Sequence, residues 1–240
     1  ILGLVGSEMC IRDRINTSSK RCLVRLDLNV PIADGVVGDD TRIRRILPGL
    51  RALRETGARL VILTHLGRPK GKVVPEMSVK PVAAALSALL GCEVPVESDV
   101  TGPGGHAAVE RLADGDVLMM ENLRFHPGEE ANDPDFAAAL AALGEIYVGD
   151  AFSCTHRAHA SVEALPRLME VATAGRSLGE ELLALHNALA DPARPVAAIV
   201  GGAKVSTKLQ VLENLVTSVD ILILGGGMAN TFLLARGQDV

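Results

Sequence analysis

Hydrophobic and polar positions follow two alternating periods from about residue 20 onward. Short apolar runs rich in leucine and β-branched residues predict strands at residues 22–28, 59–64, 93–96, 116–120, 145–148, 196–200 and 221–224. Longer stretches with helical spacing predict helices at residues 41–55, 78–90, 106–113, 135–143, 177–190, 206–216 and 228–235. Apolar strands that each lead into a helix are typical of βαβ units. The pattern therefore predicts an α/β fold with two Rossmann-like, doubly wound parallel-sheet domains, the second one incomplete.

The alternation pauses after residue 160, and this pause suggests a domain boundary. A long helix at 177–190 leads into the turn-rich segment 191–195 before a new strand begins. We expect a first domain at 15–176, a connecting helix and linker at 177–192, and the start of a second domain at 193–240. Residues 1–14 continue no later pattern, so we expect an extraneous leader and a chain that is a fragment.

Composition excludes several classes of protein. Hydrophobic residues make up 48% of the 240 residues and charged residues 22%, which argues against disorder. No apolar run reaches the ~18–20 residues that span a bilayer, so we expect no membrane partner. A net charge of −5 and only 2% aromatic residues make nucleic acid a poor partner. Four cysteines, Cys10, Cys22, Cys92 and Cys154, form no C-x-x-C pair, and we interpret them as reduced thiols of a cytoplasmic protein.

Ligands of doubly wound sheets bind beyond the carboxyl ends of the strands, so the residues that follow each strand are the candidates. Arg25, Asp27 and Asn29 share one face of the first predicted strand and alternate with apolar residues. Polar side chains on a buried strand need partners. A ligand site, a structural ion pair or a turn cap would each supply them.

More basic residues follow the later strands. They are His65 and Arg68 in THLGRPKGK, Arg124 in ENLRFHPGEE, and His156, Arg157 and His159 in DAFSCTHRAHAS. Glycines in these segments let backbone amides approach an anion, and arginine matches phosphate or carboxylate oxygens. We therefore predict a site for a small molecule that carries both phosphate and carboxylate. A metal is disfavoured because Arg157 lies between the two histidines that follow the fifth strand.

Three further acidic and basic positions have competing interpretations. Arg42 opens the helix at 41–55, where its charge opposes the helix dipole, which suggests a functional residue. A surface salt bridge to Asp39 would also explain Arg42. We interpret Glu129 and Glu130 as a solvated face or as acids at a helix start.

The second predicted domain begins with a strand that leads into Gly201-Gly202 and then a helix. This arrangement directs backbone amides and the positive end of a helix toward a phosphate. We place Lys204 and Lys208 four residues apart on one face of that helix. The next strand ends at residues 225–227, a second run of glycines. Neither segment is a P-loop or a G-x-G-x-x-G fingerprint, but together they predict a nucleotide site.

Six motifs occur in a fixed order along the chain: VRLDLNVP, THLGRPKG, ENLRFHPGEE, DAFSCTHRAHAS, VGGAKVSTKL and GGGMANTF. In these motifs the chain from about residue 20 to residue 240 closely resembles the bacterial phosphoglycerate kinases. The resemblance implies reversible transfer of the acyl phosphate of 1,3-bisphosphoglycerate to ADP, giving 3-phosphoglycerate and ATP. It further implies a monomer whose N-terminal domain binds the triose and whose C-terminal domain binds ADP or ATP with Mg²⁺.

The resemblance carries roles over to individual residues. The triose site would comprise Asp27, Asn29, Arg42, His65, Leu66, Gly67, Arg68, Arg124 and Arg157, with Arg25, His156 and His159 completing a basic patch. The nucleotide site would comprise Gly201, Gly202, Ala203, Lys204, Lys208, Gly226 and Gly227. Arg42, Lys204 and Lys208 would stabilise the transferring group, and no metal ligand is expected before residue 240. We expect this chain alone to bind 3-phosphoglycerate without turnover.

Two alternative functions make different predictions. A non-catalytic anion-binding domain would bind the anionic ligand without affinity for a nucleotide. A nicotinamide-dependent Rossmann enzyme would carry an acidic residue about 20 positions after a G-x-G-x-x-G, and no strand here is followed by that fingerprint. The fold alone would not separate these functions.

Overall fold

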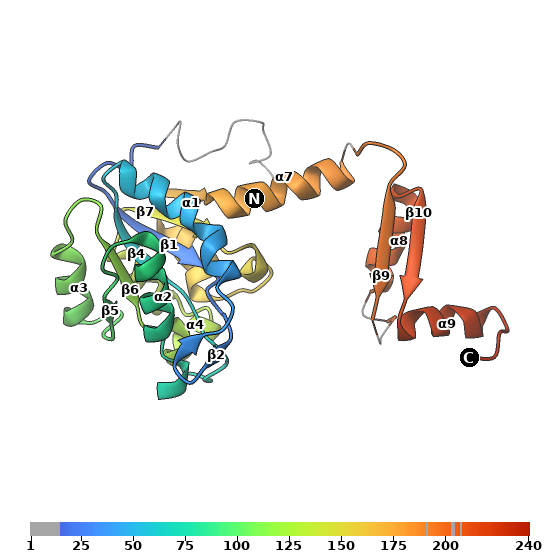
Figure 1. Ribbon diagram of the computed structural model, residues 1–240, viewed down its shortest axis with the longest axis horizontal. Coiled ribbons are helices and arrows are strands. Elements are labelled where there is room, and N and C mark those ends of the chain that lie inside the picture. Colours follow the sequence, from blue (N-terminus) through green and yellow to red (C-terminus); the bar gives the residue numbers. More distant parts are fainter. Residues whose placement is uncertain (1–14, 191, 203–204, 207) are drawn as a thin grey trace. The chain divides into compact units, whose positions relative to one another are not determined.

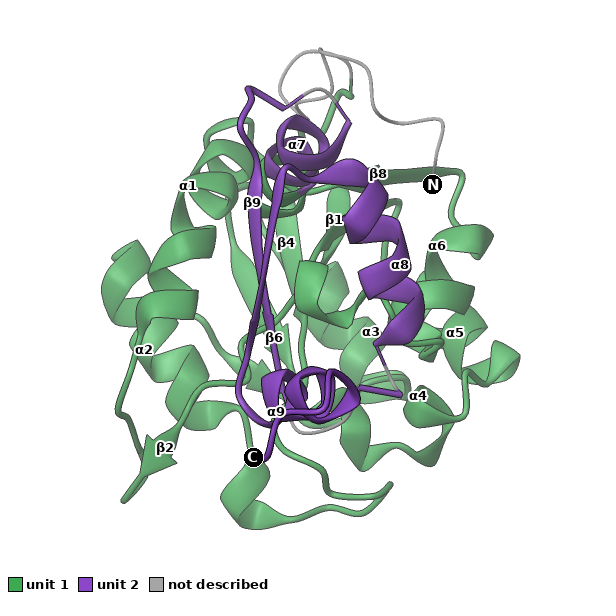
Figure 2. Cartoon of the chain, turned by 90° about the vertical axis from the view of Figure 1, so that its right-hand side faces the viewer, with its two compact units in different colours: residues 1–181 green, residues 182–240 purple. Residues whose placement is uncertain are grey.

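The computed structural model describes residues 15–190, 192–202, 205–206 and 208–240 (Figure 1). The expected leader, residues 1–14, lies outside the described residues. The chain divides into two compact units, residues 1–181 and 182–240, which Figure 2 distinguishes by colour. The division falls within helix α7 (Arg176–Leu189). Both units combine parallel strands with helices, so the predicted α/β fold class is confirmed.

The first unit is built on a parallel sheet of six strands in the order β5-β6-β4-β1-β7-β8. The strands are β1 (Arg21–Leu26), β4 (Arg59–Leu63), β5 (Val96–Glu97), β6 (Val117–Met120), β7 (Ile146–Asp150) and β8 (Val171–Ala174). The chain winds from β1 toward β5 and then returns to the other side of β1 as β7. The topological switch point, where ligands of such sheets bind, therefore lies beside the carboxyl end of β1.

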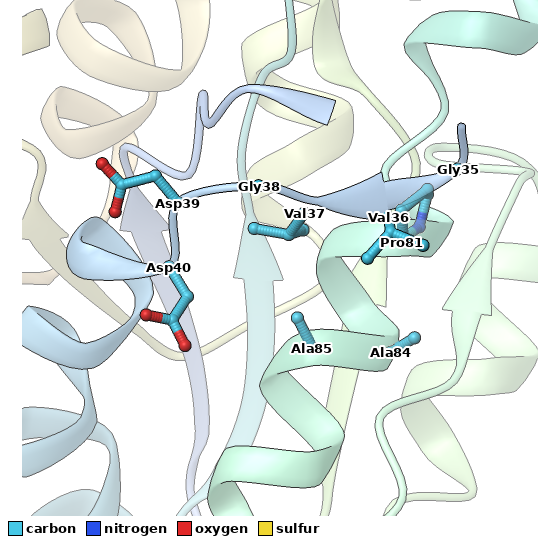
Figure 3. A pocket seen from close by; sticks show the side chains of 9 residues that line it. All are labelled: Gly35, Val36, Val37, Gly38, Asp39, Asp40, Pro81, Ala84 and Ala85. Carbon is cyan, nitrogen blue, oxygen red and sulfur yellow. The ribbon is translucent and has the colours of Figure 1, made fainter. Parts of the chain in front are cut away.

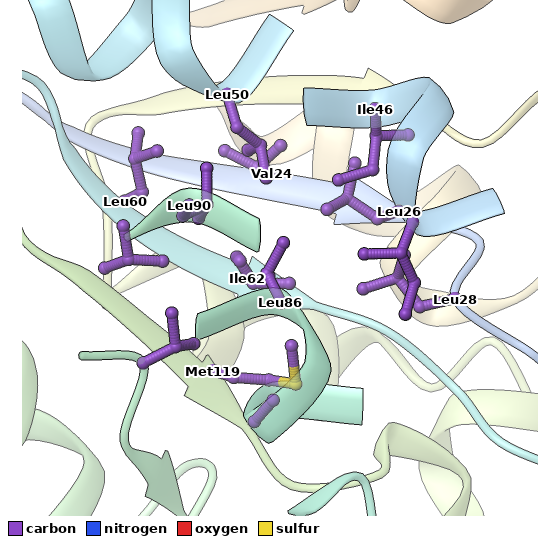
Figure 4. Packing of buried hydrophobic residues seen from close by; sticks show 14 of the residues in the cluster. Val24, Leu26, Leu28, Ile46, Leu50, Leu60, Ile62, Leu86, Leu90 and Met119 are labelled. Atoms are coloured by element: carbon purple, nitrogen blue, oxygen red, sulfur yellow. The ribbon is translucent and has the colours of Figure 1, made fainter. Parts of the chain in front are cut away.

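Helices cover both faces of this sheet because successive strand residues point to opposite faces. Val24 and Leu26 of β1 pack with α1 (Thr41–Glu55) and α2 (Lys80–Leu90), as Figure 4 shows. Leu23 packs on the opposite face. The other helices of the unit are α3 (Pro103–Glu110), α4 (Pro127–Glu130), α5 (Pro134–Ala141) and α6 (Leu165–Leu168). The two hydrophobic clusters fix which β1 side chains reach the site.

The sequence pattern missed three short strands and misplaced a fourth. Strand β8 was not predicted, because its VATA sequence lies at the edge of the sheet with every side chain at least partly exposed. The same holds for the short hairpin of β2 (Ile32–Ala33) and β3 (Val36–Val37). The strand predicted at 93–96 occupies only Val96–Glu97. Short, half-exposed strands lack the apolar contrast on which periodicity depends.

The second unit contains β9 (Ala197–Gly201), α8 (Leu209–Ser218), β10 (Ile221–Gly225) and α9 (Gly227–Ala235). Strands β9 and β10 pair in parallel, with Gly201 opposite Gly225. Their glycine-rich carboxyl ends therefore lie side by side. In the described part of the chain, no helix is long and apolar enough to cross a membrane.

Candidate functional site

Asp27 holds together polar side chains at the carboxyl end of β1. Arg42 Nη1 donates to Asp27 Oδ2 at 2.6 Å, and the hydroxyl of Ser153 donates to the same oxygen. The backbone N–H of Asn29 donates to Asp27 Oδ1 at 3.2 Å. Burial alone would raise the pKa of Asp27, but these hydrogen bonds and the Arg42 charge hold it below its ordinary value. The ionised carboxylate thus fixes the start of α1 against the segment that follows β7.

Arg42 therefore pairs with Asp27, and the alternative of a surface salt bridge to Asp39 was wrong. Asp39 accepts instead from the backbone N–H of Thr41 at 2.9 Å, just before the helix. Arg42 keeps about half of its side chain exposed at 54% while bound to Asp27. An arginine in this state has donors left for a ligand.

Arg25 lies beneath the surface of the site. Its side chain is 2% exposed, and it hydrogen-bonds to Ser161, to the Leu26 carbonyl and to His65. The Arg25 Nη2–His65 Nδ1 distance is 3.1 Å. Arg25 thus shares a face with Asp27 and Asn29 in sequence but contacts the patch through the His65 ring.

His65 is a neutral imidazole in this surrounding. The ring is 5% exposed. Burial lowers the pKa of His65 to about 3, with further lowering by the charges of Arg25 and Arg124 against a smaller opposing effect of Asp27. A site at neutral pH therefore contains an uncharged His65 among positive arginines.

Gly67 joins two parts of the site through its backbone. Its N–H donates to Asn29 Oδ1 at 2.9 Å, and its carbonyl accepts from Arg124 Nη1 at 2.7 Å. The residue has a φ of +61°, and a Cβ there would lie 2.9 Å from the Met77 sulfur. Only glycine fits this turn without strain.

Asn122 fixes the preceding residue of the same loop. Its Oδ1 accepts from the Leu66 N–H at 3.2 Å and its Nδ2 donates to the Leu66 carbonyl at 2.7 Å. Asn122 is 1% exposed, and sequence analysis did not single it out. Asn122 lies two residues after β6, in the motif that also contains Arg124, so its position after a strand was the available signal.

Arg124 contributes a buried guanidinium with an unused donor. The side chain is 4% exposed. Its Nε lies 3.3 Å from Glu130 Oε1 without hydrogen-bond geometry and has no hydrogen-bond partner among the described residues. A buried N–H without an acceptor is costly, and an anionic ligand oxygen would satisfy it.

The remaining triose-site predictions divide into two groups. Burial lowers the pKa of His159, the charge of Glu129 opposes this effect, and the charges of Arg124 and Arg157 add to it, so these groups influence one another electrostatically. Arg68 and His156 are exposed, and their side chains make no hydrogen bond or ion pair with another described residue. Arg157 and His159 thus lie near Arg124 at the carboxyl ends of the strands. Arg68 and His156 are not connected to this group by a hydrogen bond or ion pair among the described residues.

One triplet at this edge has the spacing of a metal site. Ligand atoms of Asp27, His65 and Cys154 lie within 4.8 Å of one another. Arg42 already occupies the carboxylate, and Arg25 points a donor at His65 Nδ1. Guanidinium groups repel a divalent cation and compete for its ligands, so this edge suits an anion better than a metal.

A separate hollow of about 500 Å³ lies between the β2–β3 hairpin and the start of α2 (Figure 3). Val36 and Val37 line one side, and small side chains of α2 line the other. The lining has Asp39 and Asp40 but no cationic side chain, so it does not suit an anionic ligand.

In the second unit, the two predicted glycine turns are hydrogen-bonded to each other. The Met228 N–H donates to the Gly202 carbonyl at 2.8 Å. Gly226 has a φ of +63° and immediately precedes α9, which starts at Gly227. The first backbone amides of α9 therefore lie beside the Gly201-Gly202 turn, an arrangement that suits a phosphate.

The prediction that Lys204 and Lys208 share a helix face was wrong for Lys208. Helix α8 begins at Leu209, and Lys208 is its N-cap residue. Its Nζ donates to the Gly201 carbonyl at 2.6 Å, so the ammonium group lies at the glycine turn. Ala203 and Lys204 lie outside the described residues.

The groups at these turns do not make a Mg²⁺ site. Magnesium prefers oxygen ligands, whereas backbone N–H groups and the Lys208 ammonium are donors. Among the described residues of the second unit, no three carboxylate, histidine or cysteine ligands come together. We therefore assign no magnesium-dependent step to the described residues.

Asp150, at the carboxyl end of β7, caps helix α7 and should make stability depend on pH. It accepts from the Leu178 N–H at 2.6 Å. Burial raises the pKa of Asp150 to about 6, despite the opposing backbone hydrogen bonds from Leu178 and Ser177. Since the unfolded value is about 3.9, the folded state binds more protons between these pH values. The contribution of Asp150 to stability is therefore full below pH ~4 and is lost as pH rises to ~6.

Urea unfolding of Asp150→Asn beside the unchanged chain checks this expectation. The free energy of unfolding of the unchanged chain should fall relative to that of the variant by about 1–3 kcal/mol between pH 4 and 6. Parallel pH profiles for the two proteins would show that Asp150 has an ordinary pKa.

Comparison with known proteins identifies the family to which the chain is similar. The phosphoglycerate kinase family model matches residues 12–240. The chain is 57% identical over 228 residues to the phosphoglycerate kinase of Ruegeria sp. (strain TM1040), covering 95% of this chain and 57% of that protein. It is 56% identical over 228 residues to the phosphoglycerate kinase of Brucella suis biovar 1 (strain 1330), covering 95% of this chain and 58% of that protein.

Solved structures agree with the sequence matches. The phosphoglycerate kinase structure from Coxiella burnetii superposes with a TM-score of 0.85 at 43% identity, over 95% of this chain and 57% of that one. The structure from Pyrococcus horikoshii OT3 gives 0.82 at 32% identity, over 94% and 57%. The chain thus spans slightly more than half the length of these relatives.

Fold and site together define an α/β protein with an arginine-rich edge on one parallel sheet and paired glycine turns on a second. With the family match over nearly its whole length, the chain belongs to the phosphoglycerate kinase family. The match confirms, at the level of the family, the resemblance seen in the six motifs.

Proposed function

We propose that this chain is the triose-binding part of a phosphoglycerate kinase, together with the beginning of its nucleotide-binding part. The reaction is reversible transfer of the acyl phosphate of 1,3-bisphosphoglycerate to ADP. The observation that carries the proposal is the gathering of Arg42, Arg124 and the Asp27-centred hydrogen bonds at the switch point of the sheet. Family membership supports it independently.

The described residues suit a triose with phosphate and carboxylate groups. Arg124 offers a buried donor without a hydrogen-bond partner, and neutral His65 can donate one hydrogen bond without adding charge. Arg42 is exposed enough to meet a phosphoryl oxygen while Asp27 fixes its position. Arg157 adds positive charge beside Arg124. Two anionic groups of one ligand would thereby be neutralised by separate arginines.

Phosphoryl transfer asks little of a protein beyond positioning and neutralisation of charge. The triose carboxylate is ionised at neutral pH, so it attacks or leaves without a general base. We assign Arg42 and Lys208 to stabilisation of the transferring group, since each is a cation with an exposed or half-exposed side chain. Lys204, from the same family motif, completes the set.

Further parts of the proposal rest on the family. The nucleotide would be ADP or ATP, held by the glycine turns at residues 201–202 and 226–227, with Mg²⁺ bound to the nucleotide. The protein would act as a monomer. We place it in the cytoplasm, and free thiols at Cys22, Cys92 and Cys154 support a reducing compartment.

Calorimetric titration of the 240-residue chain with 3-phosphoglycerate tests the triose site. We expect saturable binding, and we expect Arg42→Ala to raise the Kd about tenfold because a charge-assisted contact is lost. Arg44→Ala is the matched control: Arg44 lies on the same helix, is exposed and pairs with Asp40, away from the site. Its Kd should match that of the unchanged chain.

Three results would count against the proposal. A folded chain that does not bind 3-phosphoglycerate would overturn the triose-site assignment. Equal effects of Arg42→Ala and Arg44→Ala would show only a general dependence on net charge. Binding of 3-phosphoglycerate without any binding of ADP would favour the alternative of a non-catalytic anion-binding domain.

A further inference from the structure

Glu129 is a wholly buried carboxylate, which sequence analysis placed on a solvated face or at a helix start. Its side chain is 0% exposed, on the short helix α4. Oε2 accepts from the Ser161 N–H at 2.9 Å, and Oε1 accepts from the Ser161 hydroxyl at 2.6 Å. Ser161 lies in the π-helical turn Ala160–Ala164, a kind of turn that is frequent at functional sites. A carboxyl group buried in this way needs partners, and Ser161 supplies two hydrogen bonds to it.

A chain of hydrogen bonds connects this carboxylate to the triose site. Arg25 Nε lies 2.8 Å from the Ser161 hydroxyl oxygen, and Arg25 Nη2 lies 3.1 Å from His65 Nδ1. We call Glu129, Ser161, Arg25 and His65 the buried hydrogen-bond chain. Ser161 and Arg25 are themselves 0% and 2% exposed, so water does not compete along most of its length.

The direction of every hydrogen bond in this chain is fixed by its members. The Ser161 hydroxyl has one hydrogen, which it donates to Glu129 Oε1, and its oxygen accepts from Arg25 Nε. A guanidinium only donates, so His65 Nδ1 must accept from Arg25. An imidazole whose Nδ1 accepts while the ring is neutral carries its hydrogen on Nε2.

We propose that Glu129 and Ser161 are positioning residues that act through Arg25 to hold His65 as the neutral Nε2–H tautomer, a hydrogen-bond donor for an anionic oxygen of the triose. The inference rests on the proposed function for the identity of that ligand. The tautomer itself does not depend on the ligand.

The charges around the ring favour this state on balance, with Asp27 acting against it. The groups that face His65 are Arg25 from β1, Asp27 after β1, Arg124 from the segment after β6, Cys154 from the segment after β7, and His159 at the start of the π-helical turn. The two arginines oppose a second proton on the ring, and Asp27 already accepts from Arg42 and Ser153. His65 therefore stays neutral across the pH range in which the protein would work.

A merely structural pair would explain the burial of Glu129 and Arg25 but not a fixed tautomer. In that case loss of the Ser161 hydroxyl would change stability and leave the histidine unchanged. The tautomer and the Kd for 3-phosphoglycerate therefore separate the two explanations.

Nitrogen-15 spectra of the histidine rings in the 240-residue chain, without ligand, provide the first test. We expect the His65 resonances, assigned with His65→Gln, to show the Nε2–H tautomer and no titration between pH 5 and 8. A protonated ring or the Nδ1–H tautomer in the unchanged chain would overturn the proposal, whether or not the Ser161 variants fold.

Ser161→Ala and Ser161→Thr provide the second test. Ser161→Ala removes the hydroxyl that orders Arg25, and we expect mixed His65 tautomers and a Kd for 3-phosphoglycerate raised about 5–10-fold. Ser161→Thr keeps the hydroxyl and should restore the single tautomer. An unchanged tautomer in folded Ser161→Ala would refute the role of Ser161. The expected tautomer in a chain that fails to bind 3-phosphoglycerate would count against the proposed function alone.

Discussion

Arg124→Ala is expected to weaken the binding of 3-phosphoglycerate by about 100-fold or more. Arg124 is buried, its Nη1 donates to the Gly67 carbonyl at 2.7 Å, and its Nε has no hydrogen-bond partner among the described residues. Removal of a buried, hydrogen-bonded charge that meets an anionic ligand costs about 2–5 kcal/mol. The loss of the Gly67 contact should add to the effect, because that loop also presents His65. Calorimetric titration of the 240-residue chain measures the change.

Two further variants show whether the effect belongs to Arg124 itself. Arg124→Lys keeps the charge but loses the planar fork, so its affinity should lie between those of the unchanged chain and the alanine variant. Arg111→Ala removes an exposed arginine at the end of α3 and should leave the Kd unchanged. An alanine variant at position 124 that folds and binds normally would remove Arg124 from the triose site.

The second large effect concerns stability. Ile62→Ala should lower the free energy of unfolding of the first unit by about 2–5 kcal/mol. Ile62 of β4 is 0% exposed and packs with α1 and α2 in the cluster shown in Figure 4. The loss combines the transfer free energy of the removed methyl groups with the cavity left between sheet and helices.

Urea unfolding followed by circular dichroism measures this change, since the chain has no Trp for fluorescence. Val73→Ala serves as the control, because Val73 is 76% exposed and its truncation should change stability by less than about 0.5 kcal/mol. Equal small effects at both positions would mean that the sheet is not packed as described.

The architecture could be predicted because the strong elements carry strong patterns. The buried strand β4 is a continuous apolar run after Arg59, β1 is mostly apolar, and α1 repeats its apolar positions at helical spacing. Strand β8 escaped prediction because its four residues are partly exposed at the sheet edge and are recruited by pairing with β7. Tertiary pairing, rather than local pattern, creates such a strand.

The site could be predicted in part for a related reason. Residues after strands converge by topology, so Asp27, Arg42 and Arg124 could be named from their positions along the chain. The helix-start interpretation of Glu129 is confirmed, because Glu129 lies in the first turn of α4. Its burial could not be predicted, because its partner Ser161 lies 32 residues away and the packing around α4 is tertiary. Lys208 shows the same limit, since its place at a helix start depends on where α8 begins.

The central claim is that the carboxyl edge of the first sheet binds 3-phosphoglycerate, and amide NMR spectra of the 240-residue chain during titration test it most directly. We expect shifts at the carboxyl edge, at Asn29, Gly67 and Arg124, which are connected through Gly67. Gly57 and Gly115, in the turns before β4 and β6 at the opposite edge, should not move. Shifts at the opposite edge, or none at all in a folded chain, would contradict the account.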